Sequence, residues 1–168
     1  MADLDAIFKA YDVRGTTPDQ LDAPAARAIG AAFARFVARE EGTTRVLIGR
    51  DMRPSGVELA AAFSEGVRAQ GLDVVDLGLC STDLVYFAAG ALEAPAVMLT
   101  ASHNPAQYNG MKMCLAGARP IGEDTGLREI KEMAAAGVPD ADGPGGSVEQ
   151  RDLLADFAAH VRSFVDTS

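Results

Sequence analysis

The chain has 168 residues and is poor in cysteine and in lysine. Its two cysteines, Cys80 and Cys114, are too few for a disulfide scaffold and too far apart for a Cys-x-x-Cys redox pair or a metal knuckle. We therefore expect two buried, reduced thiols. Lysine occurs three times against twelve arginines, so each lysine is a candidate for a specific role.

Positive charge and long apolar runs are scarce as well. The formal net charge of −9 disfavours nonspecific binding to nucleic acid or to an anionic membrane, because both would carry the same sign as the protein. The longest apolar stretch, 84–101, is interrupted by Glu93 and Pro95 and is not a membrane span. The N-terminus lacks the charged and apolar regions of a signal peptide. We expect a soluble, cytoplasmic protein that binds neither nucleic acid nor membrane.

Several common catalytic and nucleotide-binding motifs are missing. The chain has no Gly-x-Gly-x-x-Gly after a strand and no Gly-x-x-x-x-Gly-Lys-Ser/Thr, which argues against dinucleotide and P-loop nucleotide binding. It also has no Gly-x-Ser-x-Gly elbow, and the adjacent Ser102 and His103 would point apart in an extended chain. A serine-hydrolase triad is therefore disfavoured.

Apolar periodicity predicts helices alternating with strands. We expect helices over 22–41, 55–71, 82–92 and 123–136, and strands over 46–49, 74–77, 96–100 and 111–115. Strands that alternate with helices favour parallel pairing, whereas the short loop 101–110 cannot hold a crossover helix and predicts one antiparallel pair. The expected fold class is α/β, a three-layer α/β/α domain with a mixed, mostly parallel four-stranded sheet.

The remaining segments suggest how the chain is divided. We expect residues 8–15 to form an ordered N-terminal loop and the proline- and glycine-rich stretch 139–146 to form a linker. Ser147 and Gln150 have the spacing of a capping box, so we expect the last helix to begin there. We predict one domain over residues 1–146 and a terminal helix over 147–168.

The loop that follows the predicted strand 96–100 is the strongest candidate site. It presents Ser102 at the carboxyl end of a strand, which is where ligands sit in open α/β sheets. With His103, Asn104 and Lys112 nearby, the segment combines a hydroxyl, an imidazole, an amide and a cation, a set suited to phosphate. Arg14 is a second plausible cation. The alternative is an ordinary turn, because serine, asparagine and proline dominate turns.

A second charged loop, 50–53, has the sequence Arg-Asp-Met-Arg. Its charges could face a ligand, or they could form an ion pair that stabilises the loop. The sequence leaves both interpretations open.

Three ordered motifs resemble one enzyme family. Residues 100–105, Thr-Ala-Ser-His-Asn-Pro, followed by 108–112, Tyr-Asn-Gly-Met-Lys, closely resemble the phosphoserine loop of the α-D-phosphohexomutase superfamily. Residues 11–15 and 49–56 match two more of its stretches in order and spacing. The resemblance covers essentially the whole chain, but only the first of the family's four domains. The form of residues 8–15 is more similar to the phosphomannomutase/phosphoglucomutase branch than to the phosphoglucosamine mutases.

The resemblance implies a phosphoryl relay. Phosphorylated Ser102 would transfer its group to a hexose monophosphate, and a bisphosphate intermediate would interconvert the 1-phosphate and 6-phosphate of mannose or glucose. One Mg2+ would be bound through the phosphate on Ser102 and through residues of the absent second domain. Glucose 1,6-bisphosphate is the implied activator. Because domains 2 to 4 are missing, we expect this fragment to be inactive alone.

The resemblance also assigns roles to other residues. His103 and Lys112 are implied in proton transfer or charge balance with support from Arg14, and Tyr11 and Asn104 in shaping the phosphoserine pocket. Two alternatives remain open: the same domain in a phosphoglucosamine mutase, and a non-catalytic phosphate-binding or interaction module.

Overall fold

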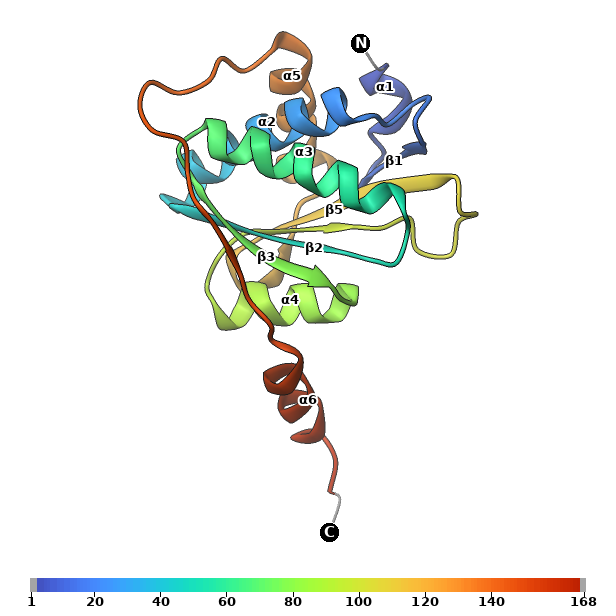
Figure 1. The fold of residues 1–168 in the computed structure, drawn as a ribbon, viewed down its shortest axis with the longest axis vertical. Helices are drawn as coiled ribbons and strands as arrows, with labels where there is room; N and C mark the ends of the chain where they lie inside the picture. The colour runs from blue at the N-terminus through green and yellow to red at the C-terminus, as the bar shows by residue number, and fades with distance from the viewer. Residues whose placement is uncertain (1–2, 167–168) are drawn as a thin grey trace.

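The computed structural model describes residues 3–166 as a mixed sheet with helices on both faces (Figure 1). The strands are β1 (Val13–Thr16), β2 (Arg45–Arg50), β3 (Asp73–Leu79), β4 (Ala96–Leu99), β5 (Tyr108–Leu115), β6 (Arg119–Pro120) and β7 (Val148–Gln150). The helices are α1 (Leu4–Ile7), α2 (Ala23–Glu41), α3 (Ser55–Ala69), α4 (Thr82–Ala91), α5 (Leu127–Ala136) and α6 (Leu154–Arg162). Two 3-10 turns, η1 (Ala116–Ala118) and η2 (Glu123–Thr125), flank β6.

The sheet has seven strands, in the order β1-β5-β4-β2-β3-β7, with β6 paired to β5. Strand β2 runs parallel to both β3 and β4, and β7 runs parallel to β3. Strand β5 is antiparallel to its neighbours β4 and β1. The predicted α/β class, the three layers and the mixed, mostly parallel pairing are confirmed. The predicted number of four strands is wrong.

The prediction missed the edge strands β1 and β7 and the two-residue strand β6, because none of the three has a strong pattern of its own. Strand β1 overlaps the end of the segment 8–15 predicted as a loop, and Val13 pairs with Met111, almost a hundred residues away. Strand β7 occupies the predicted capping box, and all three of its residues are exposed. Ser147 caps no helix: its amide and hydroxyl donate to Asp73 Oδ1 at 2.7 and 2.8 Å, and these hydrogen bonds lower the pKa of Asp73.

Other helix boundaries also differ from the predicted ones. Helix α6 begins at Leu154, and its N-cap, Leu153, makes no side-chain hydrogen bond. Helix α4 begins at the predicted residue, Thr82, and is capped by Ser81, whose hydroxyl accepts from the Leu84 amide at 3.2 Å. The predicted helix 123–136 is interrupted at Gly126, whose φ of +138° separates η2 from α5.

The core has two parts, one on each face of the sheet. Helices α2, α3 and α5 cover one face, where the rings of Phe33 and Phe63 lie 5.8 Å apart. Helix α4 covers the other face with Leu84 and Val85 (Figure 1). Helices α2 and α3 pack closely, because a Cβ at Gly66 would lie 2.1 Å from the Arg27 carbonyl oxygen. The sheet is thereby held rigidly under the loops at its carboxyl edge.

Helix α6 extends away from the sheet beyond α4 (Figure 1). None of its residues is buried, and most of its apolar side chains are exposed. Leu154 is 63% exposed and Phe164, beyond the helix, is 71% exposed. Within residues 3–166, no helix is both long enough and apolar enough to cross a membrane.

Candidate active site

The loop between β4 and β5 carries Ser102 at the carboxyl edge of the sheet, on the right in Figure 1. The Thr100 amide donates to the Gly110 carbonyl at 3.0 Å, so the two strands remain paired up to the base of the loop. Ser102 and His103 are both exposed. Ser102 has a φ of +54°, in the left-handed region that residues with a Cβ seldom adopt. Such a conformation persists only where surrounding contacts enforce it.

Several hydrogen bonds inside the loop enforce this shape. The Ser102 amide donates to Thr100 Oγ1 at 2.9 Å, and the Thr100 hydroxyl donates to Asp51 Oδ2 at 2.7 Å. The backbone amide and the side-chain amide of Asn104 both donate to the Ala101 carbonyl at 3.0 Å. His103 Nδ1 lies 3.4 Å from Ser102 Oγ, within reach of a weak hydrogen bond. The serine hydroxyl is therefore exposed on a loop with fixed geometry.

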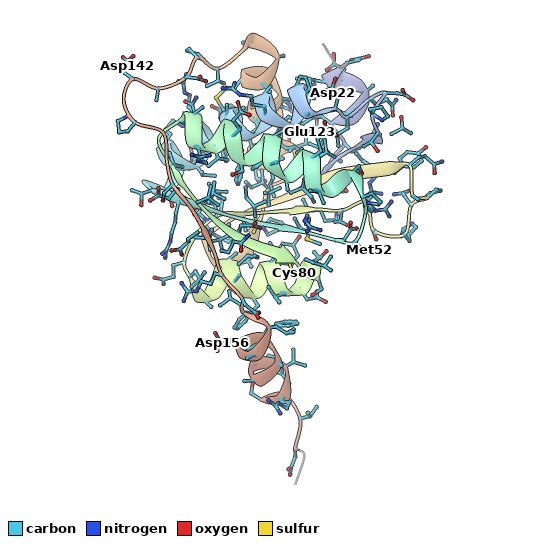
Figure 2. All side chains as sticks on the ribbon, in the orientation of Figure 1. Asp22, Met52, Cys80, Glu123, Asp142 and Asp156 are labelled. Carbon is cyan, nitrogen blue, oxygen red and sulfur yellow. The ribbon has the colours of Figure 1, made fainter. Side chains whose placement is uncertain are left out.

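Arg53 lies behind this loop, and only 6% of its surface is exposed. The preceding Met52, labelled in Figure 2, marks the position of the β2–α3 loop at this edge of the sheet. The Arg53 guanidinium pairs with Asp51 at 3.3 Å and donates to four main-chain carbonyls, those of Ser102, Asn104, Pro105 and Tyr108, at 2.8–2.9 Å. Of the two interpretations of this charged loop, the stabilising ion pair is confirmed for Asp51 and Arg53.

Two predicted cations share one carboxylate beside the serine loop. Asp12 Oδ2 accepts from Arg14 Nη2 at 2.5 Å and from Lys112 Nζ at 3.3 Å. Arg14 lies opposite Gly110 on β5, where a Cβ would meet the Val13 carbonyl oxygen at 2.2 Å, so glycine allows β1 to approach. Asp12 is buried, whereas the side chains of Arg14 and Lys112 are 26% and 30% exposed. The arrangement orients both cations and leaves them partly accessible.

Arg14 keeps unused donor capacity. Its Nε is buried and has no hydrogen-bond partner among the described residues. A buried N–H group without an acceptor is costly. Sequence reasoning missed Asp12 as the shared partner of both cations. The sequence feature that could have indicated it is the Asp-x-Arg spacing of Asp12 and Arg14, which recurs at Asp51 and Arg53.

The predicted site residues fall into three places. Ser102, His103 and Asn104 lie on one loop, and Arg14 and Lys112 lie on the two strands next to it. Tyr11 is 80% exposed and lines a shallow depression with residues 120–125. Within residues 3–166, no hydrogen bond joins the Tyr11 hydroxyl to the serine loop.

The two cysteines lie on the α4 face of the sheet, and neither forms a disulfide. Cys114 is buried and Cys80 is half-buried. Burial raises the pKa of each thiol to about 11, so neither is a thiolate near neutral pH.

The described part of the chain does not hold a complete metal site. No group of three or more histidine, cysteine, aspartate or glutamate side chains in residues 3–166 is arranged to bind an ion. Asp51 is the carboxylate bonded to the loop, and both of its oxygens already accept from Arg53 or Thr100. A phosphate oxygen on Ser102 would fit as one ligand of a hard cation such as Mg2+, and the other ligands would come from outside these residues.

Comparison with known proteins gives a consistent result. Residues 5–138 match the family model described as phosphoglucomutase/phosphomannomutase, alpha/beta/alpha domain I. The chain is 44% identical over 162 residues to a protein of Xanthomonas campestris named "Phosphohexose mutases", and 36% identical over 164 residues to a Salmonella montevideo phosphomannomutase. Each alignment covers 96% of this chain and 35% of the relative.

Solved structures agree with the sequence matches. A phosphoglucomutase/phosphomannomutase family protein from Burkholderia thailandensis superposes with a TM-score of 0.84 and 38% identity over 96% of this chain. A putative phosphomannomutase from Thermus thermophilus gives 0.79 and 31% over 95%. Each alignment covers 36% of the solved chain, so this chain spans about a third of the length of its relatives.

Proposed function

This chain belongs to the phosphoglucomutase/phosphomannomutase family as its α/β/α domain I, and on that basis we propose that Ser102 is the phosphoryl carrier of a phosphohexomutase. The observation that supports the proposal is the exposed Ser102 hydroxyl on a braced loop beside two partly exposed cations. A phosphate on this oxygen would carry about −1.5 to −2 charge and would need such cations nearby.

The proposed reaction exchanges one phosphate ester for another. The bond between phosphorus and Ser102 Oγ breaks while a sugar hydroxyl oxygen bonds to the same phosphorus. The proton of the sugar hydroxyl passes to a base, and the leaving Ser102 Oγ takes up a proton. His103 and Lys112 are the proposed groups for proton transfer and charge balance, and Arg14 supports them with its partly exposed guanidinium. Asn104 fixes the loop, and Tyr11 is retained as a substrate contact at the rim. The reverse transfer at the other end of the sugar restores phosphorylated Ser102.

Further components of the reaction would come from outside this chain. We propose hexose 1-phosphates and 6-phosphates of mannose or glucose as substrates, Mg2+ bound partly through the phosphate on Ser102, and glucose 1,6-bisphosphate as activator. When bound, Mg2+ would supply charge stabilisation at the transferring phosphoryl group. The predicted serine domain over residues 1–146 gains the edge strand β7 (Val148–Gln150), so the connection to the missing domains would begin after β7 and not at residue 147, in a cytoplasmic enzyme.

Replacement of the serine tests this proposal directly. In the longest chain that contains this domain, Ser102→Ala should abolish interconversion of the sugar phosphates and remove phosphate uptake from glucose 1,6-bisphosphate, as read by mass spectrometry. Ser64→Ala is the matched control, because Ser64 lies in the middle of α3. Retained activity in the Ser102 variant would refute the proposal. A rate comparison of mannose, glucose and glucosamine 6-phosphates would then identify the sugar.

A further inference from the structure

We propose that Arg53 is a positioning residue that sets the direction of the Ser102 hydroxyl for phosphoryl transfer, an inference that rests on the proposed role of Ser102. A guanidinium has five N–H donors in a planar fork. In Arg53 all five are used: Nε bonds Asp51, Nη1 bonds the carbonyls of Pro105 and Tyr108, and Nη2 bonds those of Ser102 and Asn104.

The four carbonyls belong to different parts of the loop. Nη2 holds the segment that carries the serine, and Nη1 holds the segment that returns to β5. One buried side chain from a different loop therefore cross-links the Ser102 loop along its length. Lysine has three donors on a single nitrogen and lacks the planar fork, so it cannot reproduce this set of contacts.

The contacts fix both peptide groups that flank the Ser102 Cα. The Ser102 amide is held by Thr100 Oγ1 at 2.9 Å, and its carbonyl is held by Arg53 Nη2 at 2.8 Å. Both partners converge on Asp51 Oδ2, which accepts from the Thr100 hydroxyl and from Arg53 Nε. This closed network imposes the left-handed φ of +54° and thereby determines where the hydroxyl points.

The network also favours a phosphate on Ser102 electrostatically. A carbonyl oxygen facing the phosphate would repel it, and Arg53 binds four of the loop carbonyls on its own side. In-line transfer depends strongly on geometry, because a displacement of about 1 Å can cost about 100-fold in rate.

Arg53→Lys in the longest chain that contains this domain is the principal test. The rate of phosphate uptake at Ser102 from glucose 1,6-bisphosphate should fall by about 100-fold, because the hydroxyl loses its fixed direction. KM for the sugar phosphate should stay within about twofold, since Arg53 is buried behind the loop and all of its donors bond to the protein. Amide hydrogen exchange over residues 101–108 should become faster. Arg45→Lys is the matched control, because Arg45 Nη2 also bonds a carbonyl, that of Leu92, at the opposite end of β2.

Each outcome is decisive. Normal phosphate uptake in Arg53→Lys would overturn the positioning role and leave the proposed function intact. Slow uptake without faster hydrogen exchange of the loop amides would have the same meaning. A parent enzyme that never accepts phosphate on Ser102 would instead refute the proposed function, and this inference with it. If Arg53→Lys does not fold, Thr100→Val opens the same network at its other end, and Thr100→Ser should restore transfer.

Discussion

Two Asp-x-Arg segments of this protein place an arginine beside a carboxylate and use it in opposite ways. In Asp51-Met52-Arg53 the guanidinium is buried, and all five of its donors bond to the protein. In Asp12-Val13-Arg14 the arginine side chain is 26% exposed, one terminal nitrogen bonds the carboxylate, and Nε has no partner among residues 3–166. The same local spacing thus yields a structural brace in one case and a cation with spare donors in the other.

The difference arises from what surrounds each segment. Arg53 follows β2 into the space beneath a loop whose carbonyls point inward, so its donors find acceptors in the protein. Arg14 lies on the edge strand β1 next to Lys112, and both depend on a single carboxylate. The surroundings of each arginine, and not the shared Asp-x-Arg motif, therefore decide how many of its donors are satisfied within the protein.

The largest expected effect is on folding stability. Arg53→Ala should lower the free energy of unfolding by about 3–5 kcal/mol, because it leaves the Asp51 charge and four carbonyls without their partner. Arg14→Ala should cost less than about 1 kcal/mol, since Lys112 continues to neutralise Asp12 and the pair is partly exposed. Urea denaturation of the two variants beside the parent chain measures the contrast. Equal losses of unfolding free energy in the two variants would show that Arg53 and Arg14 contribute alike to stability.

A smaller effect in free energy is expected on activity, where Arg14, unlike in folding stability, should matter about as much as Arg53. In the longest chain, Arg14→Ala should slow phosphate uptake at Ser102 by about 100-fold, the usual cost of losing one donor to transition-state charge. Arg128→Ala is the control, because Arg128 is an exposed arginine paired only with surface carboxylates. An Arg14 variant with a normal rate would remove Arg14 from the candidate site and leave Lys112 as its cation.

The sequence predicted the elements with strong patterns and missed those that depend on distant partners. The long amphipathic helix α2 and the apolar strands β2 and β4 carry their own signal and were found. Strands β1 and β7 have four and three residues, and they become strands only by pairing with β5 and β3. Short edge strands of mixed polarity have no local period from which they could be recognised.

The candidate site was predicted in the same uneven way. Ser102, His103 and Asn104 are contiguous, so a motif could identify them together. The role of Arg53 could not be read from the sequence, because its acceptors lie 49–55 residues further along and converge only in the folded chain. Asp12 was missed for a similar reason, since its partner Lys112 lies 100 residues away.

The smallest expected effect concerns the backbone at Ser102 itself. A residue with a Cβ costs about 1–2 kcal/mol in the left-handed region, and glycine avoids this cost but loses more chain entropy on folding. Ser102→Gly should therefore be more stable than Ser102→Ala by about 0.5–1 kcal/mol, with both variants inactive. Paired thermal denaturation measures this difference.

The same pair of variants made in the Arg53→Lys background sharpens the comparison between the two arginines. If Arg53 imposes the φ of +54°, the loop relaxes once the guanidinium is gone, and the advantage of glycine over alanine should disappear. If the glycine variant is still more stable than the alanine variant in this background, the Thr100 hydroxyl alone maintains the strained conformation through its contact with the Ser102 amide. The stability difference between the glycine and alanine variants thus reports which contact holds Ser102 in its strained conformation.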